Sequence, residues 1–326
     1  MLKTRLLLAA LILSPLLTVV YLDYTVTDWA PGLLLIPLAF LVSAMAAGEV
    51  HSLLHHQLGS RPAWPVVVGA FGVALASAMP LGWDLMGNEY PARCAVGPAG
   101  WPVIALSIAV MVLFGLEMRR FGKEGNPDEN RTDKASSEEA NPQERSSEGG
   151  KGEYLAALSG QTLAVVYAGL LPSFLILLRR YRDNDWGMLA LVSLLVITKM
   201  GDTLAYTFGK TMGKHKLSPR LSPGKTIEGA VGSMIGAVAS AIACGFWLQP
   251  ALTGTRADGA ELLWWAALGT AVGIFGMVGD LAESLLKRDA GKKDSSSWMP
   301  GLGGILDVID SVLFAGPVAY IFWIAS

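Results

Sequence analysis

Long apolar stretches, separated by short polar segments, run along most of the 326-residue chain. A helix needs about 20 apolar residues to cross the ~30 Å hydrocarbon core of a bilayer. The stretches are uninterrupted, whereas the strands of a transmembrane barrel alternate apolar and polar residues. We therefore predict an all-α, polytopic membrane protein. About nine stretches meet the length criterion: Leu6–Leu22, Gly32–Ala47, Trp64–Leu81, Trp101–Leu116, Leu155–Leu178, Gly187–Phe208, Gly229–Leu248, Leu262–Leu286 and Gly304–Ala325.

One segment interrupts this pattern. Sixteen charged residues lie between Arg119 and Glu153, among Ser, Asn and Gly and with almost no large apolar residue. Such a segment cannot bury enough apolar surface to offset the entropy of folding. We expect residues 119–153 to be a disordered, charged cytoplasmic linker. It would separate four N-terminal helices (residues 1–118) from five C-terminal helices (residues 154–326).

Composition narrows the class of protein. Hydrophobic residues make up 52% of the chain and charged residues 16%, whereas soluble domains carry about 25% charged residues. This excludes an ordinary cytosolic enzyme. A net charge of −2 with no basic face gives no reason to expect a nucleic-acid partner. Cys94 and Cys244 lie far apart in sequence and give neither a metal-binding spacing nor a disulfide framework.

Basic residues predict how the chain is oriented, because cytoplasmic loops are enriched in Lys and Arg. Lys3 and Arg5 place the N-terminus inside, and the basic loops Lys210–Lys225 and Lys287–Lys293 fall inside if there are nine spans. The segment 179–182 contains three arginines and would lie outside, against the rule. Either the fifth stretch does not cross fully, or the rule is violated there. Pro172 is compatible with a broken or tilted helix.

Acidic side chains within the predicted spans are candidates for function, because a charge inside a bilayer is costly. They lie at a similar predicted depth, in the inner third of the membrane. A single carboxylate near a membrane edge often caps a helix or faces water, but several at one depth would repel each other unless cations neutralised them. Their oxygens are the hard ligands that Mg²⁺ prefers, and pairs spaced i, i+3 share a helix face. These residues are Asp202, Asp280, Glu283, Asp307 and Asp310.

Two loops at the same depth combine basic residues with Gly, Ser and Pro. One runs from Gly209 to Gly229 and the other from Lys287 to Gly304. Glycine allows a backbone to approach phosphate closely, and the N–H groups at a helix start favour anions. Positive-inside anchoring explains the charges but not the clustered Gly and Pro. Metal-binding carboxylates beside phosphate-binding cations in a membrane suggest phosphoryl or nucleotidyl transfer on a lipid.

The C-terminal motifs resemble the signature of phosphatidate cytidylyltransferases, also called CDP-diacylglycerol synthases. The resemblance covers about Tyr154–Ser326. Two positions depart from the family pattern: Leu302 stands where the family usually has His, and Val308 where it usually has Arg. The matching segments are GDLAESLLKRDAGKKD (279–294), PGLGGILDVIDS (300–311), DTLAYTFGK (202–210) and SPGKTIEG (222–229).

The resemblance implies a reaction in which CMP passes from CTP to phosphatidate, giving CDP-diacylglycerol and pyrophosphate for phospholipid synthesis. It implies Mg²⁺ as cofactor, held by the five acidic residues above, and is compatible with a second cation. It further implies catalysis by Asp280, Asp307, Asp310, Lys225 and Lys287. The residues expected to bind substrate are Tyr206, Ser222, Thr226, Glu228, Ser284, Arg288, Lys292 and Lys293.

Related functions remain open at this point. A CTP-dependent lipid kinase, or a cytidylyltransferase acting on another lipid phosphate or alcohol, would use the same chemistry. A cation-coupled transporter is disfavoured because the halves show no inverted repeat. We expect an integral protein of a bacterial cytoplasmic (inner) membrane, with its active site near the cytoplasmic face. The small-residue pairs Gly232/Gly236 and Gly269/Gly273 favour close helix packing and are also compatible with a homodimer.

Overall fold

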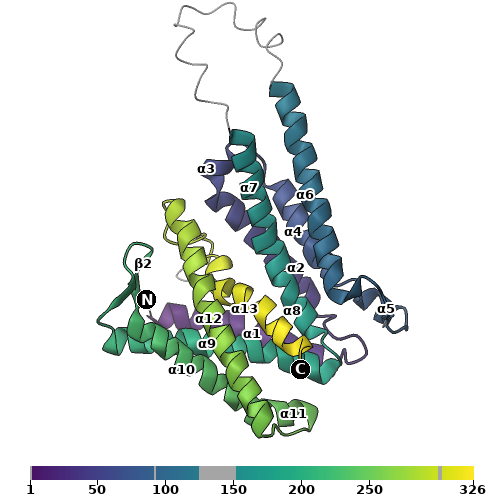
Figure 1. Cartoon of the computed structure of the whole chain (residues 1–326), viewed down its shortest axis with the longest axis vertical. Helices are drawn as coiled ribbons and strands as arrows, with labels where there is room; N and C mark the ends of the chain where they lie inside the picture. The colour runs from purple at the N-terminus through teal and green to yellow at the C-terminus, as the bar shows by residue number, and fades with distance from the viewer. Residues whose placement is uncertain (1, 92, 125–151, 300–302) are drawn as a thin grey trace, which may run out of the picture.

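The computed structural model describes residues 2–91, 93–124, 152–299 and 303–326 and folds them almost entirely into helices (Figure 1). The N-terminal elements are α1 (Leu2–Thr25), α2 (Leu35–Leu53), α3 (His55–Leu58), α4 (Trp64–Ser77), α5 (Leu81–Leu85) and α6 (Gly97–Glu124). The C-terminal elements are α7 (Glu153–Val165), η1 (Val166–Leu170), α8 (Leu171–Arg179), α9 (Asn184–Met212), β1 (Lys216–Ser218), β2 (Ser222–Thr226), α10 (Ile227–Ala243), η2 (Cys244–Leu248), α11 (Gln249–Thr253), α12 (Gly259–Asp289) and α13 (Leu306–Ile324).

The helices are those of a polytopic membrane protein, which confirms the predicted fold class. Among the described residues, seven helical segments are long and apolar enough to cross a bilayer. Two further predicted spans correspond to α1, a helix of 24 residues, and α4, an apolar helix of 14 residues. The crossing segments are Leu35–Leu53, Gly97–Phe121, Glu153–Arg179, Asn184–Met212, Ile227–Thr253, Gly259–Asp289 and Leu306–Ile324.

The two halves of the chain share a hydrophobic core. Helices α2 and α4 pack against η1, α7 and α8, and buried side chains such as Val50 and Val73 join one cluster with Val165 and Leu306. Helix α6 continues to Glu124, into the segment that we predicted to be a linker. The remainder of that prediction, residues 125–151, lies outside the described residues.

The arginines at 179–182 are held by local partners. The helical segment before them runs from Glu153 to Arg179, so the fifth stretch is long enough to cross a bilayer. A π-helical turn at Val166–Leu170 precedes Pro172. Arg179 is buried, with its Nε atom 2.7 Å from Asp23 Oδ2. Arg180 lies 2.7 Å from Asp84. The pairing explains how this basic segment can lie apart from the other basic loops.

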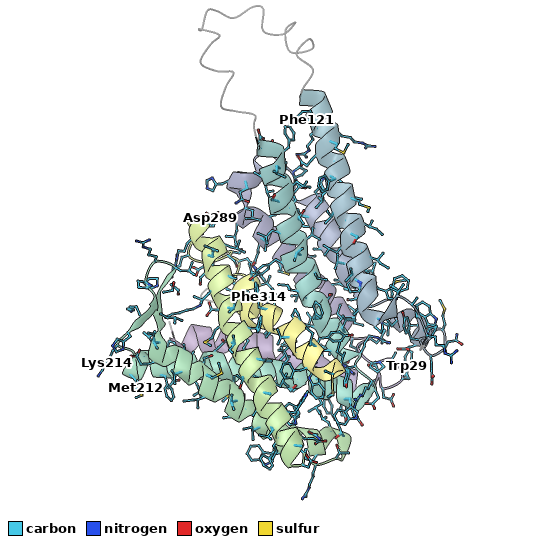
Figure 2. All side chains as sticks on the ribbon, viewed as in Figure 1. Trp29, Phe121, Met212, Lys214, Asp289 and Phe314 are labelled. Carbon is cyan, nitrogen blue, oxygen red and sulfur yellow. The ribbon has the colours of Figure 1, made fainter. Side chains whose placement is uncertain are left out.

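The ends of several spans can be located in Figure 2. Figure 2 shows Phe121 of α6 at the top of the view, Asp289 of α12 at the upper left and Lys214, just after α9, at the lower left, whereas Trp29 lies at the lower right. Trp29 and Arg180 line a common cavity, so the arginine segment belongs to the Trp29 side. The orientation that the basic loops indicate stays a prediction.

Close helix contacts bring α9, α10, α12 and α13 together. A Cβ atom placed on Gly236 of α10 would lie 2.7 Å from the Met200 carbonyl oxygen of α9, and one on Gly279 of α12 would lie 2.5 Å from the Asp310 carbonyl oxygen of α13. No side chain fits at either distance. Glycine at these positions lets the helix backbones approach each other closely. For Gly236 this confirms the predicted role in close helix packing. The Gly279 contact sets the acidic stretches of α12 and α13 side by side.

The basic loop after α9 folds into a short hairpin, where the sequence indicated only a Gly- and Ser-rich loop. Strands β1 and β2 pair antiparallel, with Ser218 opposite Ser222. Thr226, the last residue of β2, caps α10: its Oγ1 atom accepts a hydrogen bond of 3.0 Å from the Gly229 N–H. The hairpin thus leads directly into a helix start, beside the carboxylates of α12.

Candidate active site

A cavity of about 480 Å³ opens between α9, α10, α12, α13 and the hairpin. This volume lies in the range of ligand pockets. Most of the predicted site residues line it, and they come from segments that lie as far apart in sequence as Asp202 and Asp310. They are Asp202, Tyr206, Lys225, Thr226, Asp280, Glu283, Lys287, Asp307 and Asp310.

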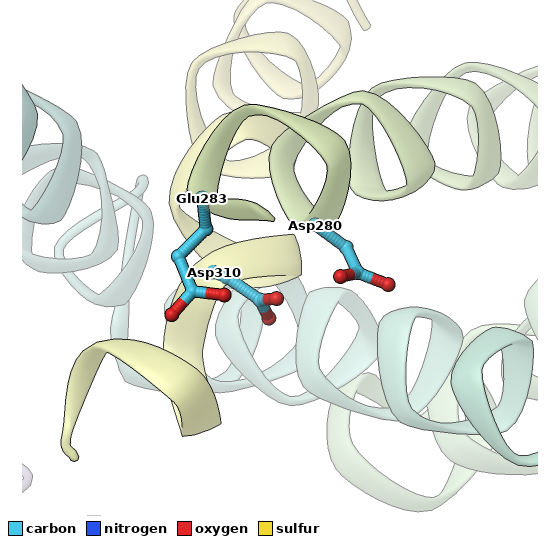
Figure 3. Close-up of side chains that lie close together, drawn as sticks. All are labelled: Asp280, Glu283 and Asp310. Atoms are coloured by element: carbon cyan, nitrogen blue, oxygen red, sulfur yellow. The ribbon is translucent and has the colours of Figure 1, made fainter. Parts of the chain in front are cut away.

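Three carboxylates form an acidic triad at one wall of the cavity: Asp280, Glu283 and Asp310 (Figure 3). Each offers one oxygen, and these oxygens all lie within 4.8 Å of one another. Asp280 and Glu283 share a face of α12 because they are spaced i, i+3, and α13 contributes Asp310. Glu283 is 1% exposed and Asp310 is 7% exposed, so two of the three anions are removed from water.

The acidic triad has the properties of a divalent-cation site. Its ligand atoms are all hard oxygens from rigid helices, as Mg²⁺ prefers. In the described structure, Glu283 Oε1 is buried and accepts no hydrogen bond. An unsatisfied anionic oxygen in a desolvated position is costly, and a cation would satisfy it. The donor set therefore fits a metal ion.

Asp202 faces the acidic triad from α9 and is connected to it through Ser311. The Ser311 hydroxyl lies 3.2 Å from Asp202 Oδ1 and 3.1 Å from Asp310 Oδ1. Asp202 is about two-fifths exposed and is not within the triad's close grouping. It remains beside the candidate metal site rather than at its centre.

Two lysines partly neutralise these anions. The Nζ atom of Lys225 lies 2.7 Å from Asp280 Oδ2. That of Lys287 lies 2.5 Å from Glu283 Oε2 and 2.6 Å from Asp307 Oδ1. The cations reach the cavity from β2 and from the end of α12. A triphosphate entering between them would meet positive charge next to the oxygens that could hold its metal ion.

We expected Asp307 to bind Mg²⁺, and in the structure both of its carboxylate oxygens contact donor groups of the protein. Its Oδ1 atom binds Lys287, and its Oδ2 atom accepts hydrogen bonds from the Ser295 N–H (2.9 Å), the Ser295 hydroxyl (2.7 Å) and the Gly304 N–H (2.8 Å). Both oxygens therefore have donors as partners. These contacts fix the start of α13 and the position of Lys287, and Asp307 is not grouped with the acidic triad.

The remaining predicted substrate-binding residues lie outside the cavity lining of the described chain. Glu228 binds the backbone N–H of Lys214 and His215 and so anchors the hairpin. Arg288 donates to the carbonyl oxygens of Leu221 and Lys292, which ties the hairpin to the end of α12. The others are Ser222 at the start of β2, buried Ser284, Lys292 with its Nζ atom 3.1 Å from Ser52, and exposed Lys293.

Comparison with known proteins identifies the family. The family model described as "Cytidylyltransferase family" matches residues 3–325. The chain belongs to the cytidylyltransferase family. The match extends over the N-terminal helices, where the sequence motifs alone gave only apolar character.

Curated relatives of this cytidylyltransferase match it over shorter regions. A protein named "Phosphatidate cytidylyltransferase" from Staphylococcus aureus (strain COL) is 36% identical over 50% of this chain and 58% of its own length. One of the same name from Staphylococcus haemolyticus is 38% identical over 44% and 52%, respectively. "Uncharacterized protein YnbB" from Escherichia coli (strain K12) is 39% identical over 42% and 43%. The chain thus spans about half the length of the curated relatives that it matches.

Glu49 is a site-supporting residue that our sequence analysis missed. This buried carboxylate near the end of α2 accepts hydrogen bonds from the Ile305 and Leu306 N–H groups (3.0 Å each), the Ser295 hydroxyl (2.8 Å) and the Trp298 indole (3.0 Å). It caps α13 from another helix. In this cytidylyltransferase the N-terminal half therefore holds the start of α13, where Asp307 lies. A local sequence pattern contains no signal for a cap supplied from such a distance.

Proposed function

We propose that this cytidylyltransferase acts on phosphatidate. It would transfer CMP from CTP to the lipid phosphate and produce CDP-diacylglycerol and pyrophosphate. The observation that carries the proposal is the acidic triad, flanked by Lys225 and Lys287, in a cavity between membrane helices. This arrangement suits a polyphosphate and a lipid phosphate that meet at the membrane.

The proposed step needs few protein groups. An oxygen of the lipid phosphate attacks the α-phosphorus of CTP and forms the new P–O bond. The bond from the α-phosphorus to the oxygen that bridges to the β-phosphorus breaks, and pyrophosphate leaves with the electron pair. The attacking oxygen is already ionised at neutral pH, so no general base is required. The protein's contribution is to position the two substrates and to stabilise charge.

Within this proposal, Asp280, Glu283 and Asp310 would hold Mg²⁺, and Asp202 is the carboxylate available to a second cation. The bound metal ion would act as a Lewis acid on phosphate oxygens and offset charge on the departing pyrophosphate. Lys225 and Lys287 would hold the triphosphate, because the ammonium group of each contacts the acidic triad and each side chain is only partly exposed. Thr226, at the start of α10, would add a hydrogen-bond donor from the cavity wall.

We further propose that the site faces the cytoplasm across a bacterial inner membrane. The two basic loops Lys210–Lys225 and Lys287–Lys293 support this orientation, because cytoplasmic loops are enriched in Lys and Arg. Gly232, Gly236 and Gly269 lie at close contacts between helices of the same chain, where a Cβ atom would not fit. They therefore give no support for a homodimer, which stays a prediction.

The test uses the full-length protein purified in detergent, with CTP, phosphatidate and MgCl₂. Asp310→Asn should lower the rate of pyrophosphate release at least about a hundredfold, the size of effect typical of lost electrostatic stabilisation. Its circular dichroism and gel-filtration profile should match those of wild type. Glu89→Gln, an exposed residue on the Trp29 side, is the matched control.

The products decide between the proposal and its alternatives. CDP-diacylglycerol and pyrophosphate in equal amounts support it. Release of CDP together with a phosphorylated lipid would instead identify a CTP-dependent kinase. If wild-type protein forms no CDP-lipid from phosphatidate but does so from another lipid phosphate, the family assignment stands and the proposed substrate is wrong.

A further inference from the structure

Lys199 is a charged residue in the middle of a membrane helix that our sequence analysis did not use. It lies on α9 about 20 Å along the helix axis from the end at Met212. An ammonium group at such a position is costly and usually faces a cavity or a partner. Lys199 lines the same cavity as the acidic triad.

The contacts of Lys199 hold its ammonium at the cavity and leave capacity for a ligand. Its Nζ atom lies 3.2 Å from Asp202 Oδ2 and 2.9 Å from the carbonyl oxygen of Val308. An ammonium has three donors. The acceptors in the described part of the chain account for two, so one donor remains for a molecule in the cavity.

Lys199 differs in its exposure from Lys225 and Lys287, two of the other lysines that line the cavity. Its side chain is 48% exposed, against 23% for Lys225 and 12% for Lys287, which are bound to the acidic triad. Thr203, Tyr206 and Lys210 follow it along the same exposed face of α9. Lys199, Tyr206 and Lys210 also line the cavity, so this exposed face of α9 borders the site. Of the two cavity lysines on α9, Lys199 lies about 16 Å further into the membrane helix than Lys210, so it is the one that a phosphate arriving from the bilayer would meet.

The position of Lys199 also bears on a departure in the sequence. Val308 stands where the family resemblance places an arginine, so α13 lacks a cation at that point. Lys199 reaches the backbone of this same residue from α9. The ammonium group of Lys199 thus lies beside the backbone of residue 308, although a different helix supplies it.

We propose that Lys199 binds the phosphate of the lipid substrate, and that Asp202 and the Val308 carbonyl group position its ammonium for this contact. The inference rests on the proposed function, because it names the group that recognises phosphatidate in the same site. Lys225 and Lys287 then serve the nucleotide, and Lys199 serves the lipid.

The test is a comparison of the two substrates in steady-state kinetics. Lys199→Met should raise KM for phosphatidate about 10- to 100-fold, the range expected for one lost charge-assisted hydrogen bond. KM for CTP should stay within about threefold of the wild-type value, since other groups hold CTP. Lys199→Arg, which keeps the charge, should stay much closer to wild type for phosphatidate. Lys214→Met, an exposed lysine just beyond α9, is the control.

Two additional measurements keep the test decisive. Lys199→Gln gives a second neutral variant if the methionine variant does not fold. Recovery of a low KM for phosphatidate in Lys199→Met/Val308→Arg would support the proposal, because the arginine would return the cation to α13. An unchanged KM for phosphatidate in both neutral variants, or an equal rise in KM for CTP, would overturn it. Wild-type protein that makes no CDP-diacylglycerol contradicts the proposed function, whereas active wild type with unaffected neutral variants contradicts only the role of Lys199.

Discussion

At the scale of single residues, the five acidic side chains that looked equivalent in the sequence divide into different environments. Glu283 has a buried oxygen without a hydrogen-bond donor, whereas both oxygens of Asp307 are occupied by Lys287, Ser295 and Gly304. Spacing along the chain could indicate that these residues share a depth. It could not indicate which of them already have partners, because Ser295 and Gly304 approach Asp307 only through the fold of the loop.

This difference gives a prediction for two matched substitutions. Glu283→Gln should raise the Mg²⁺ concentration needed for half-maximal activity at least about tenfold, since it removes a ligand charge. Asp307→Asn should leave the Mg²⁺ dependence unchanged but lower the free energy of unfolding by about 1–3 kcal/mol, because it weakens charge-assisted hydrogen bonds. Mg²⁺ titrations and thermal unfolding measure the two effects. An equal rise in the Mg²⁺ requirement for Asp307→Asn would restore it as a metal ligand.

At the scale of elements, the apolar pattern predicted most helices to within a few residues, and the i, i+3 pairs predicted the shared face of α12. The hairpin β1–β2 and the cap that Glu49 supplies to α13 could not be predicted in this way. Both depend on contacts between segments distant in sequence: Glu49 binds Ser295, Trp298 and the first N–H groups around α13. The helices follow from local periodicity, but the alignment of their ends is a property of tertiary packing.

The contact between α12 and α13 can be tested at one glycine. In Gly279→Ala the new methyl group would meet the Asp310 carbonyl oxygen at 2.5 Å, so the two helices must separate. Overpacking of this kind typically costs 1–3 kcal/mol. We expect a lower thermal unfolding temperature and a large loss of activity, since Asp310 moves away from Asp280. Gly276→Ala is the control, because its nearest contact would be an ordinary 3.7 Å. Equal tolerance of both substitutions would show that this approach is not needed for the site.

At the scale of the whole molecule, the two ends of the helical assembly differ in how their positive charges are used. On the Trp29 side, Arg179 and Arg180 are paired with Asp23 and Asp84. On the other side, the hairpin and the end of α12 carry lysines that line or border the cavity. A count of basic residues treats both sides alike. Their surroundings differ: Arg179 and Arg180 pair with acidic residues of the N-terminal segments, whereas Lys225 and Lys287 pair with acidic residues that line the cavity of the candidate active site.

This asymmetry predicts the sidedness of the protein in cells. In a Cys94→Ser background, Lys214→Cys should react with a membrane-impermeant maleimide only in inside-out vesicles, and Asp28→Cys only in right-side-out vesicles. Both positions are exposed, whereas Cys244 is buried and should stay unlabelled in folded protein, which makes it an internal control. Labelling of Lys214→Cys from the outside would place the cavity on the wrong face for cytoplasmic CTP. The orientation would then be reversed, and a nucleotide substrate would have to be abandoned even if the carboxylates still bound a metal ion.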